Sequence, residues 1–283
     1  MIIQDLTLKI RKLLSENLGL TLREANIESI FILRHVLRVD HEYLIKNFDK
    51  LIKTKKLDKI MRLVLERISH KPLAYIFKEW KFYDMEFYIN SNVLIPRQDT
   101  ELLIDLIIRE YNSQKKTDIL DLGTGSGVIG IVLGNKFKNS TILLSDISLN
   151  ATYIAKKNIL RHNLKNVSVI QSNWFSKIPK KKFDVIVSNP PYINKSDPHL
   201  KDKGLFYEPR EALISEQEGY ADIIEIIKIS PKFLTPSGTL YIEHGYNQHK
   251  EVHQLFVDNN FTKIKHNEDL NGIIRVTSGK IKI

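Results

Sequence analysis

The chain contains no cysteine among its 283 residues. This absence excludes disulfides, thiol nucleophiles, and zinc or iron–sulfur sites with cysteine ligands, and no metal site is predicted. No uninterrupted apolar run approaches the roughly 18 residues of a membrane span. The N-terminal segment carries Asp5 and Lys9 within its apolar pattern, unlike a signal peptide. We therefore expect a soluble, cytoplasmic protein that does not associate with membranes.

Acidic residues are outnumbered, with 33 Asp and Glu against 43 Lys and Arg, which gives a formal net charge of +10. Lysine is spread along the whole chain, with clusters at residues 53–56 and 180–182. Such a balance is compatible with compositional drift, and equally with attraction to nucleic acid, ribosomes or an acidic protein. The charge alone does not choose between these readings.

Glycine is nearly absent from the first eighty residues, where only Gly19 occurs. Apolar residues in this region recur at helical spacing, and Asp40 is placed to cap a helix. The sequence therefore predicts a small all-helical module of four or five helices. The positions that define its apolar faces are Leu6, Ile10, Leu13, Leu14, Ile30, Leu33, Val36, Leu37, Ile60, Leu63, Val64 and Ile68.

Residues 74–94 are rich in aromatic and β-branched residues on either side of a turn-like Tyr-Asp-Met, which predicts a hairpin. A helix is expected to follow, with Asp99 as its N-cap and Glu101 in its first turn.

From residue 116 onward, strand and helix patterns alternate. This alternation, with continuous apolar strands, predicts a parallel sheet covered by helices on both faces. Ligands of such sheets bind at the carboxyl ends of the strands. The predicted strands are residues 117–122, 141–147, 167–172, 183–188, 238–244 and 272–279, and the predicted helices are residues 127–137, 149–163, 220–234 and 249–259.

The first of these strands ends in a glycine-rich loop, residues 121–130. Its glycines allow the backbone to turn sharply and approach a ligand closely. Positions 123, 125 and 127 have the spacing of S-adenosylmethionine (AdoMet) methyltransferases, whereas positions 125, 127 and 130 match the dinucleotide fingerprint. Asp146, at the end of the next strand, would bind ribose in either case. Asp121 favours AdoMet, because a carboxylate at this point would repel a pyrophosphate.

The fourth strand ends in Asn189-Pro190-Pro191-Tyr192. Proline fixes its own φ and restricts the residue before it, so these prolines hold Asn189 and Pro190 in a set geometry. The Asn189 side-chain oxygen and the Pro190 carbonyl then form two rigid acceptors, suited to a planar –NH2 group. Tyr192 offers a ring face to a flat group or a sulfonium. The sequence thus predicts an amine- or amide-directed methyltransferase.

The combination of these motifs resembles the protein-(glutamine) methyltransferase family known as PrmC or HemK. The resemblance covers most of the chain. It rests on "KPLAYIFKEWKFYDMEF" (71–87), "VLIPRQDTELLID" (93–105), "ILDLGTGSG", "SNPPYI", "YEPREAL", "LYIEHG" with Gln248, and "DLNGIIRV" (269–276).

The resemblance implies an α/β fold, a seven-stranded AdoMet-dependent methyltransferase (Rossmann-like) sheet preceded by an all-helical domain. The implied domains are a helical substrate-docking domain at 1–73, a hairpin linker at 74–98 and the methyltransferase domain at 99–283. The implied reaction methylates the glutamine of the Gly-Gly-Gln motif in class-1 peptide chain release factors and yields S-adenosylhomocysteine. A monomer that does not bind nucleic acid stably is expected.

The resemblance also implies roles for individual residues. Trp174 would line the adenine site, and Asp146 would bind the ribose. Asn189, Pro190, Pro191 and Tyr192 would hold the glutamine, with Asn189, Pro190 and Tyr192 acting in catalysis. The residues expected to bind the cofactor are Asp121, Gly123, Thr124, Gly125, Ser126, Gly127, Asp146, Trp174 and Asn189.

The chain departs from the family pattern at Gln98-Asp99, where the family usually has Pro-Glu, and at Asn173, where an acid often precedes the tryptophan. His244 is given no role. Two other functions compete: a nucleic-acid methyltransferase acting on the exocyclic amine of adenine or guanine, which the same clamp would hold, and a non-catalytic AdoMet-binding or ribosome-associated module. No RNA-binding signature or additional target-recognition domain is found.

Overall fold

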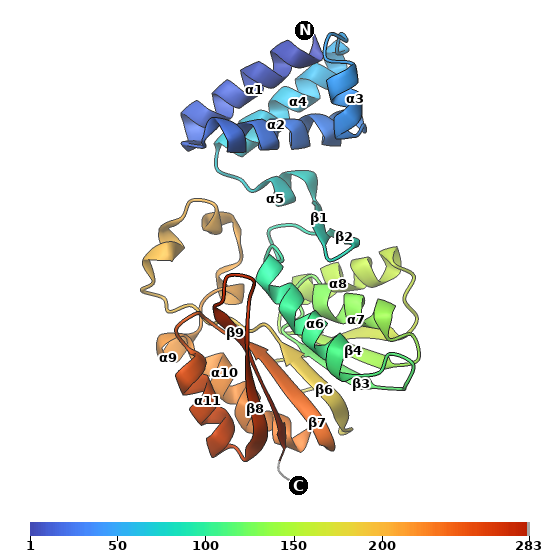
Figure 1. Cartoon of the computed structure of the whole chain (residues 1–283), viewed down its shortest axis with the longest axis vertical. Helices are drawn as coiled ribbons and strands as arrows, with labels where there is room; N and C mark the ends of the chain where they lie inside the picture. Colours follow the sequence, from blue (N-terminus) through green and yellow to red (C-terminus); the bar gives the residue numbers. More distant parts are fainter. Residues whose placement is uncertain (282–283) are drawn as a thin grey trace. The chain divides into compact units, whose positions relative to one another are not determined.

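The computed structural model describes residues 1–281 and divides into two compact units, the first spanning Met1–Lys78 and the second beginning at Glu79 (Figure 1). In the described part of the chain, no helix is both long and apolar enough to cross a membrane.

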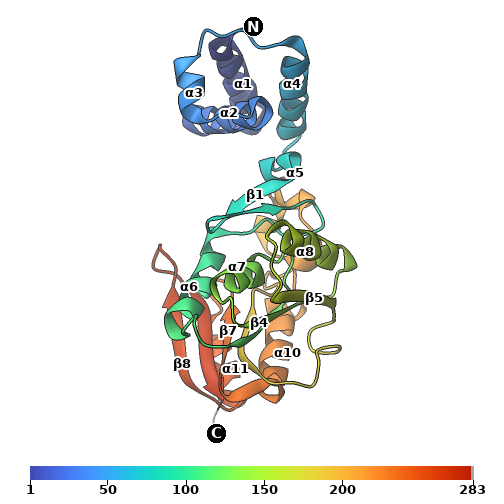
Figure 2. The same cartoon turned by 90° about the vertical axis from the view of Figure 1, so that its right-hand side faces the viewer.

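The first unit is a helical domain, as predicted, with one isolated β-bridge between Ile2 and Leu51. Its helices are α1 (Ile3–Leu18), α2 (Leu22–Leu37), α3 (His41–Lys46), α4 (Thr54–Ile68) and α5 (Leu73–Phe77), and Figure 2 shows α1, α2 and α4 packed together. Their apolar faces meet in one core. Asp40 caps α3 as predicted, because its carboxylate accepts the Tyr43 N–H at 2.7 Å. Gly19 ends α1 in the left-handed conformation, with φ +70°.

The second unit begins with a hairpin of β1 (Glu79–Phe82) and β2 (Met85–Tyr88). The hairpin is shorter than the 74–94 stretch predicted for it, because the first residues of that stretch, up to Phe77, belong to helix α5. Asn158 of α8 (Leu149–Arg161) binds the hairpin by pairing with both backbone groups of Tyr88. The same amide donates to the Ser126 carbonyl at 2.8 Å, so it ties the hairpin to the glycine loop.

The expected N-cap role of Asp99 is wrong. Residues Gln98–Thr100 form a 3₁₀ turn, and α6 (Glu101–Glu110) follows without a side-chain cap. Asp99 instead faces Arg275, with 3.5 Å between the carboxylate and the guanidinium. Glu101 does lie in the first helical turn, where its carboxylate accepts the Tyr83 N–H at 2.8 Å.

A seven-stranded sheet forms the centre of the second unit. Its order is β5-β4-β3-β6-β7-β9-β8, with β3 to β7 parallel and β9 antiparallel to both β7 and β8. Helices α6, α7 (Val128–Lys136) and α8 pack on one face, while α10 (Ala221–Ile229) and α11 (His249–Asp258) cover the other (Figures 1 and 2). The strands are β3 (Asp118–Leu122), β4 (Thr141–Asp146), β5 (Val167–Gln171), β6 (Phe183–Ser188), β7 (Leu234–Glu243), β8 (Phe261–Glu268) and β9 (Ile274–Ile281).

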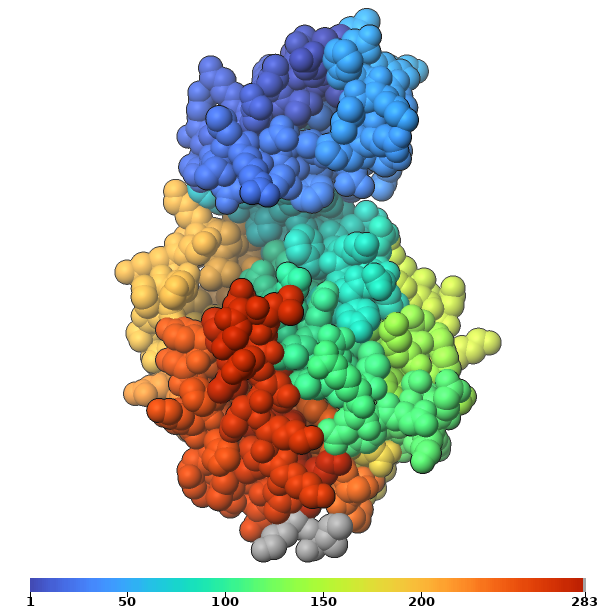
Figure 3. Space-filling view, viewed as in Figure 1, coloured from blue at the N-terminus to red at the C-terminus, as the bar shows by residue number. Residues whose placement is uncertain are grey.

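All six strands predicted for this unit are present, and the seventh strand, β8, escaped the pattern analysis. β8 lies at the sheet edge, and most of its residues are polar and at least partly exposed. Figure 3 shows it on the molecular surface. An edge strand needs no continuous apolar run, so its hydrophobic signal is weak. The two strands at this side also make the sheet mixed rather than wholly parallel.

The carboxyl ends of β3 and β6 lie side by side. Leu122 and Ser188 are in register, and the Ser188 hydroxyl donates to the Leu122 carbonyl at 2.8 Å. This arrangement confirms the expectation that the fourth predicted strand ends beside the first. It brings the loop after β3 and the turn after β6 to one edge of the sheet.

Candidate active site

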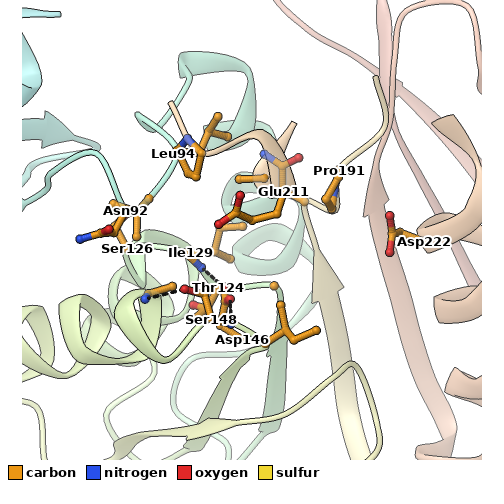
Figure 4. A pocket seen from close by; sticks show the side chains of 18 of the residues that line it. Asn92, Leu94, Thr124, Ser126, Ile129, Asp146, Ser148, Pro191, Glu211 and Asp222 are labelled. Atoms are coloured by element: carbon orange, nitrogen blue, oxygen red, sulfur yellow. Dashed lines mark hydrogen bonds between the residues drawn. The ribbon is translucent and has the colours of Figure 1, made fainter. Parts of the chain in front are cut away.

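A pocket of about 310 Å³ opens at this edge of the sheet. Its walls come from the glycine loop, the ends of β4 and β5, the turn after β6, and the segment after the hairpin. Figure 4 shows Leu94 and Glu211 on one side, with Asp146 and Ser148 on the other. Residues that line it include Asn92, Val93, Leu94, Pro96, Thr100, Gly123, Thr124, Gly125, Ser126, Asp146, Asn173, Trp174, Asn189, Pro191, Glu211 and Asp222.

The glycine loop uses left-handed backbone at three positions, with φ +68° at Gly123, +55° at Gly125 and +88° at Gly127. A Cβ at Gly125 would meet no atom within 4 Å, so packing within the protein does not require glycine at this position. A Cβ at Gly127 would lie 2.8 Å from Ile131, and one at Gly130 would lie 2.6 Å from Leu144. Gly130 is thus explained by packing of α7 on the sheet, while Gly125 leaves open space toward the pocket.

Asp121 lies beneath this loop and is fully buried. Its Oδ2 accepts the Thr124 hydroxyl at 2.6 Å and the Gly130 N–H at 3.0 Å. Its Oδ1 is buried without a hydrogen-bond partner among the residues that the structure describes. Burial raises the pKa of Asp121 to about 7, although both hydrogen bonds oppose the shift. The carboxyl group therefore holds the loop from below.

Asp146, at the end of β4, faces the pocket with a carboxylate fixed by two backbone amides. Oδ2 accepts the Gly125 N–H at 2.8 Å, and Oδ1 accepts the Ser148 N–H at 2.9 Å. Burial raises the pKa of Asp146, and the nearby carboxylate of Glu211 acts in the same direction. Because each carboxylate oxygen has a second lone pair, Asp146 can still accept hydrogen bonds from a ligand diol.

Trp174 forms the wall next to Gly123. A Cβ on Gly123 would lie 3.2 Å from the indole, so the absence of a side chain at Gly123 lets the ring pack against the loop. Trp174 has φ +40°, a strained conformation for a bulky residue. Its Nε1 donates to Asp222 at 3.1 Å, and Asp222 also accepts the Ser215 hydroxyl at 2.5 Å. These bonds hold the indole against the pocket.

The turn after β6 contains two acceptor groups, the Asn189 side-chain oxygen and the Pro190 carbonyl. Asn189 Nδ2 donates to the Thr100 hydroxyl at 3.0 Å, and no protein donor binds its Oδ1 among residues 1–281. Within the same described residues, the Pro190 carbonyl accepts no hydrogen bond from a backbone N–H of the loops and turns. Asn189 and Pro191 line the pocket, whereas Pro190 is buried behind them.

Tyr192, at the end of this turn, is partly buried. Its hydroxyl donates to Glu243 Oε1 at 3.3 Å. Burial raises the pKa of Tyr192, and the Glu243 carboxylate raises it further, so the phenol stays neutral. Burial also raises the pKa of Glu243 to about 7. Tyr192 is thereby held by its hydroxyl, with its ring packed against the core on one side.

The structure brings most of the predicted site residues to one pocket, but not all of them. Asp121, Gly127, Pro190 and Tyr192 lie behind its lining. Sequence reasoning missed Thr100, Glu211, Asp222 and the 92–96 segment. Glu211 lies within "YEPREAL" and Thr100 within "VLIPRQDTELLID". The family motifs therefore contain both residues, but the sequence predicted no role for either. Within residues 1–281, no cluster of three or more His, Asp and Glu side chains is placed to hold a metal ion.

Comparison with known proteins assigns the family. A family model described as PrmC N-terminal domain matches residues 9–77, and one described as methyltransferase small domain matches residues 98–213. The release factor glutamine methyltransferase of Francisella tularensis is 38% identical over 251 residues, covering 88% of this chain and 88% of that protein. The chain belongs to the release factor glutamine methyltransferase family.

The chain also matches part of a longer protein. A bifunctional methyltransferase of Rickettsia bellii is 36% identical over 279 residues, covering 88% of this chain, and the chain spans 50% of its length. A solved methyltransferase from Pyrococcus furiosus superposes with a TM-score of 0.54 at 16% identity, covering 80% of this chain and 100% of that one. That likeness confirms the methyltransferase fold expected from the sequence.

Proposed function

We propose that this protein transfers a methyl group from AdoMet to the side-chain amide nitrogen of the glutamine in the Gly-Gly-Gln motif of class-1 peptide chain release factors. The observation that carries the proposal is the pair of unengaged acceptors, Asn189 Oδ1 and the Pro190 carbonyl, beside the glycine loop. The family and the names of its curated members support this choice of substrate.

The residues of the pocket fit AdoMet. Gly125 leaves room for close approach of a ligand to the loop, Asp146 has lone pairs for the ribose hydroxyls, and Trp174 offers a flat wall for adenine. The carboxyl group of Asp121 under the loop is a hydrogen-bond acceptor that would disfavour the charge of a pyrophosphate wherever it is ionised. When bound, AdoMet supplies an electrophilic methyl group.

The sheet itself also argues against a dinucleotide enzyme. Dinucleotide-binding sheets commonly have six parallel strands in the order 3-2-1-4-5-6. Here the last strand, β9, turns back and inserts antiparallel between β7 and β8. The alternative left open by the glycine spacing is thereby disfavoured.

The clamp after β6 acts on the nucleophile. An amide nitrogen is a poor nucleophile because its lone pair is delocalised. Two acceptors on its hydrogens return electron density to nitrogen and fix the direction of the lone pair. Such alignment can supply roughly 7–11 kcal/mol in favourable cases. Once the new bond forms, the methylated nitrogen is strongly acidic and passes its proton to solvent water, so the clamp needs no strong base. Pro191 lines the pocket on the glutamine side, and Tyr192 supports the turn from behind.

We also propose that the helical unit docks the body of the release factor. This unit carries an apolar groove, lined by residues that include Leu8, Ile30, Ile45 and Phe48. Ile45 is 61% exposed and Phe48 is 52% exposed, so both apolar side chains are accessible to a partner at the groove. The protein would act as a monomer in the cytoplasm, where release factors work.

The test of this function is methyl transfer from labelled AdoMet to a purified release factor and to its Gly-Gly-Ala variant. The proposal expects label only in the Gly-Gly-Gln protein. Equal labelling of both, or incorporation into purified DNA or RNA instead, would overturn it. Deleting residues 1–70 should spare AdoMet binding and weaken methylation of the whole factor, and unchanged kinetics would refute the docking role.

A further inference from the structure

Thr100 joins the segment after the hairpin to the turn after β6. It is 3% exposed, lines the pocket, and accepts a hydrogen bond from Asn189 Nδ2 at 3.0 Å. Among residues 1–281 this is the one hydrogen bond that the Asn189 side chain makes. Eighty-nine positions separate the two residues, so the fold rather than the local sequence creates this contact.

The bond decides what Asn189 can do. An asparagine amide can turn over and present either its oxygen or its –NH2 group to the pocket. Only the oxygen can accept a hydrogen from a substrate –NH2 group, because –NH2 facing –NH2 forms no useful bond. With Nδ2 held by Thr100, Oδ1 is the atom left for the ligand.

The Thr100 hydroxyl can hold this orientation, because its oxygen accepts from Asn189 Nδ2 and its single hydrogen stays available for a second partner. On its other side lies the buried carboxylate of Glu243, whose charged form the hydroxyl stabilises. A carboxylate accepts and does not donate, so Thr100 keeps a lone pair for Asn189.

Thr100 is itself held on both sides. Its N–H donates to the Arg97 carbonyl at 3.2 Å. The preceding Asp99 faces Arg275, and Arg275 is in turn bound by Asp269 at 3.1 Å. Asp99 is one of the two departures from the family pattern, and its contact links the Thr100 turn to β9.

We propose that Thr100 is a positioning residue for methyl transfer, whose hydroxyl holds the Asn189 amide with Oδ1 directed at the reacting –NH2 group. The inference rests on the function proposed above for Asn189. It concerns the orientation of the nucleophile, so it affects turnover and leaves cofactor binding unchanged.

The test compares Thr100→Val, which keeps the shape, with Thr100→Ser, which keeps the hydroxyl. Thr117→Val is the matched control, a buried threonine before β3 and outside the pocket. Loss of one orienting hydrogen bond should lower kcat on the release factor about tenfold in Thr100→Val. The serine variant and the control should stay within about threefold of wild type, and AdoMet affinity should change less than about twofold in all three.

A double-mutant cycle separates positioning from a structural role. In an Asn189→Ala background, Thr100→Val should lower kcat no further, because the amide that it orients is gone. The role of Thr100 would be overturned if Thr100→Val had wild-type kcat, or if it lowered kcat by the same factor with and without Asn189→Ala. In either case, methylation of the release factor by the wild type would leave the proposed function intact. A wild type that labels no release factor would overturn both. Thr100→Ala replaces the valine variant if that variant does not fold.

Discussion

The ends of β3 and β6 lie side by side in the sheet, but the backbone that follows them has opposite properties. After β3 the chain continues in a loop with glycine at 123, 125 and 127, all in left-handed backbone. After β6 it continues in two prolines, which restrict the backbone and donate no N–H. One end is open to close approach by a ligand, and the other presents fixed acceptors.

The difference follows from what each end must hold. A cofactor that lies along a loop needs backbone without a Cβ in its way. A small –NH2 group needs two acceptors whose separation and angle do not vary. The account therefore predicts that changes after β3 and β4 alter cofactor affinity, whereas changes after β6 alter turnover. Each of the following variants tests this division.

The largest effect is expected for Asn189→Ala. Removing one of the two acceptors should lower the rate on the order of 100- to 1000-fold, by analogy with the loss of a preorganised polar group. AdoMet affinity, measured by calorimetry, should fall far less than the rate, because the cofactor has other contacts in the pocket. A loss below tenfold with binding intact would mean that Asn189 does not orient the nucleophile.

Asp146→Asn should act on the other side of the comparison. The variant keeps the shape but loses the charge and one of the two acceptor oxygens that bind Gly125 and Ser148. A hydrogen bond to a charged group contributes about 1.5–3 kcal/mol, so AdoMet affinity should fall roughly 10- to 100-fold. Turnover at saturating AdoMet should change far less, and a dominant loss of kcat would break the division.

Gly125→Ala tests the open approach to the glycine loop, and the chain offers a matched control. Gly19, at the end of α1, also has left-handed backbone and no atom within 4 Å of a Cβ position. Both changes should cost about 1–2 kcal/mol of backbone strain. Only Gly125→Ala should weaken AdoMet binding, by about tenfold, in a calorimetric titration. Equal affinities in the two variants would show that no ligand approaches Gly125.

The smallest effect concerns Asp121 and pH. Its folded-state pKa is raised to about 7, so the folded state holds a proton that the unfolded state has released. This group's contribution to stability is therefore complete at acidic pH and is lost as pH rises through about 7. In urea titrations between about pH 5 and about pH 8, wild type should lose stability relative to Asp121→Asn. A gap that does not depend on pH would contradict the raised pKa.

His244 should act on stability in the opposite sense. It is fully buried, and burial lowers its pKa to about 4. The stability that depends on a neutral His244 is present above about pH 6.5 and is lost as pH falls toward about 4. The Asp121→Asn comparison with wild type cancels this contribution, because both proteins carry His244.

The sequence predicted strands best where both faces of the strand are buried, because burial requires a continuous run of apolar residues. The continuous apolar strands β3, β4 and β6, together with the glycine loop, could be placed from residue types alone. β8 could not, because an edge strand exposes polar residues and needs little hydrophobic pattern. Asp99 was assigned to a cap for a local reason, but a distant arginine on β9 determines its place.

The candidate site shows the same limit. Asn189 and Asp146 could be proposed because Asn189 directly follows a strand and Asp146 ends one. Thr100, Glu211 and Asp222 reach the pocket from segments whose position depends on tertiary packing, and nothing in their spacing marks them. Asp121 has the residue type expected of a ligand contact, yet its hydrogen bonds lie within the loop. Sequence predicts which strand ends matter, and the fold decides which side chains meet there.

The most direct measurement is a competition in one reaction, with labelled AdoMet, a purified release factor and total DNA and RNA, followed by mass spectrometry of the labelled peptide. The account predicts one methyl group on the side-chain nitrogen of the Gly-Gly-Gln glutamine, and its disappearance with Asn189→Ala. Label in nucleic acid, or on another residue of the release factor, would contradict it.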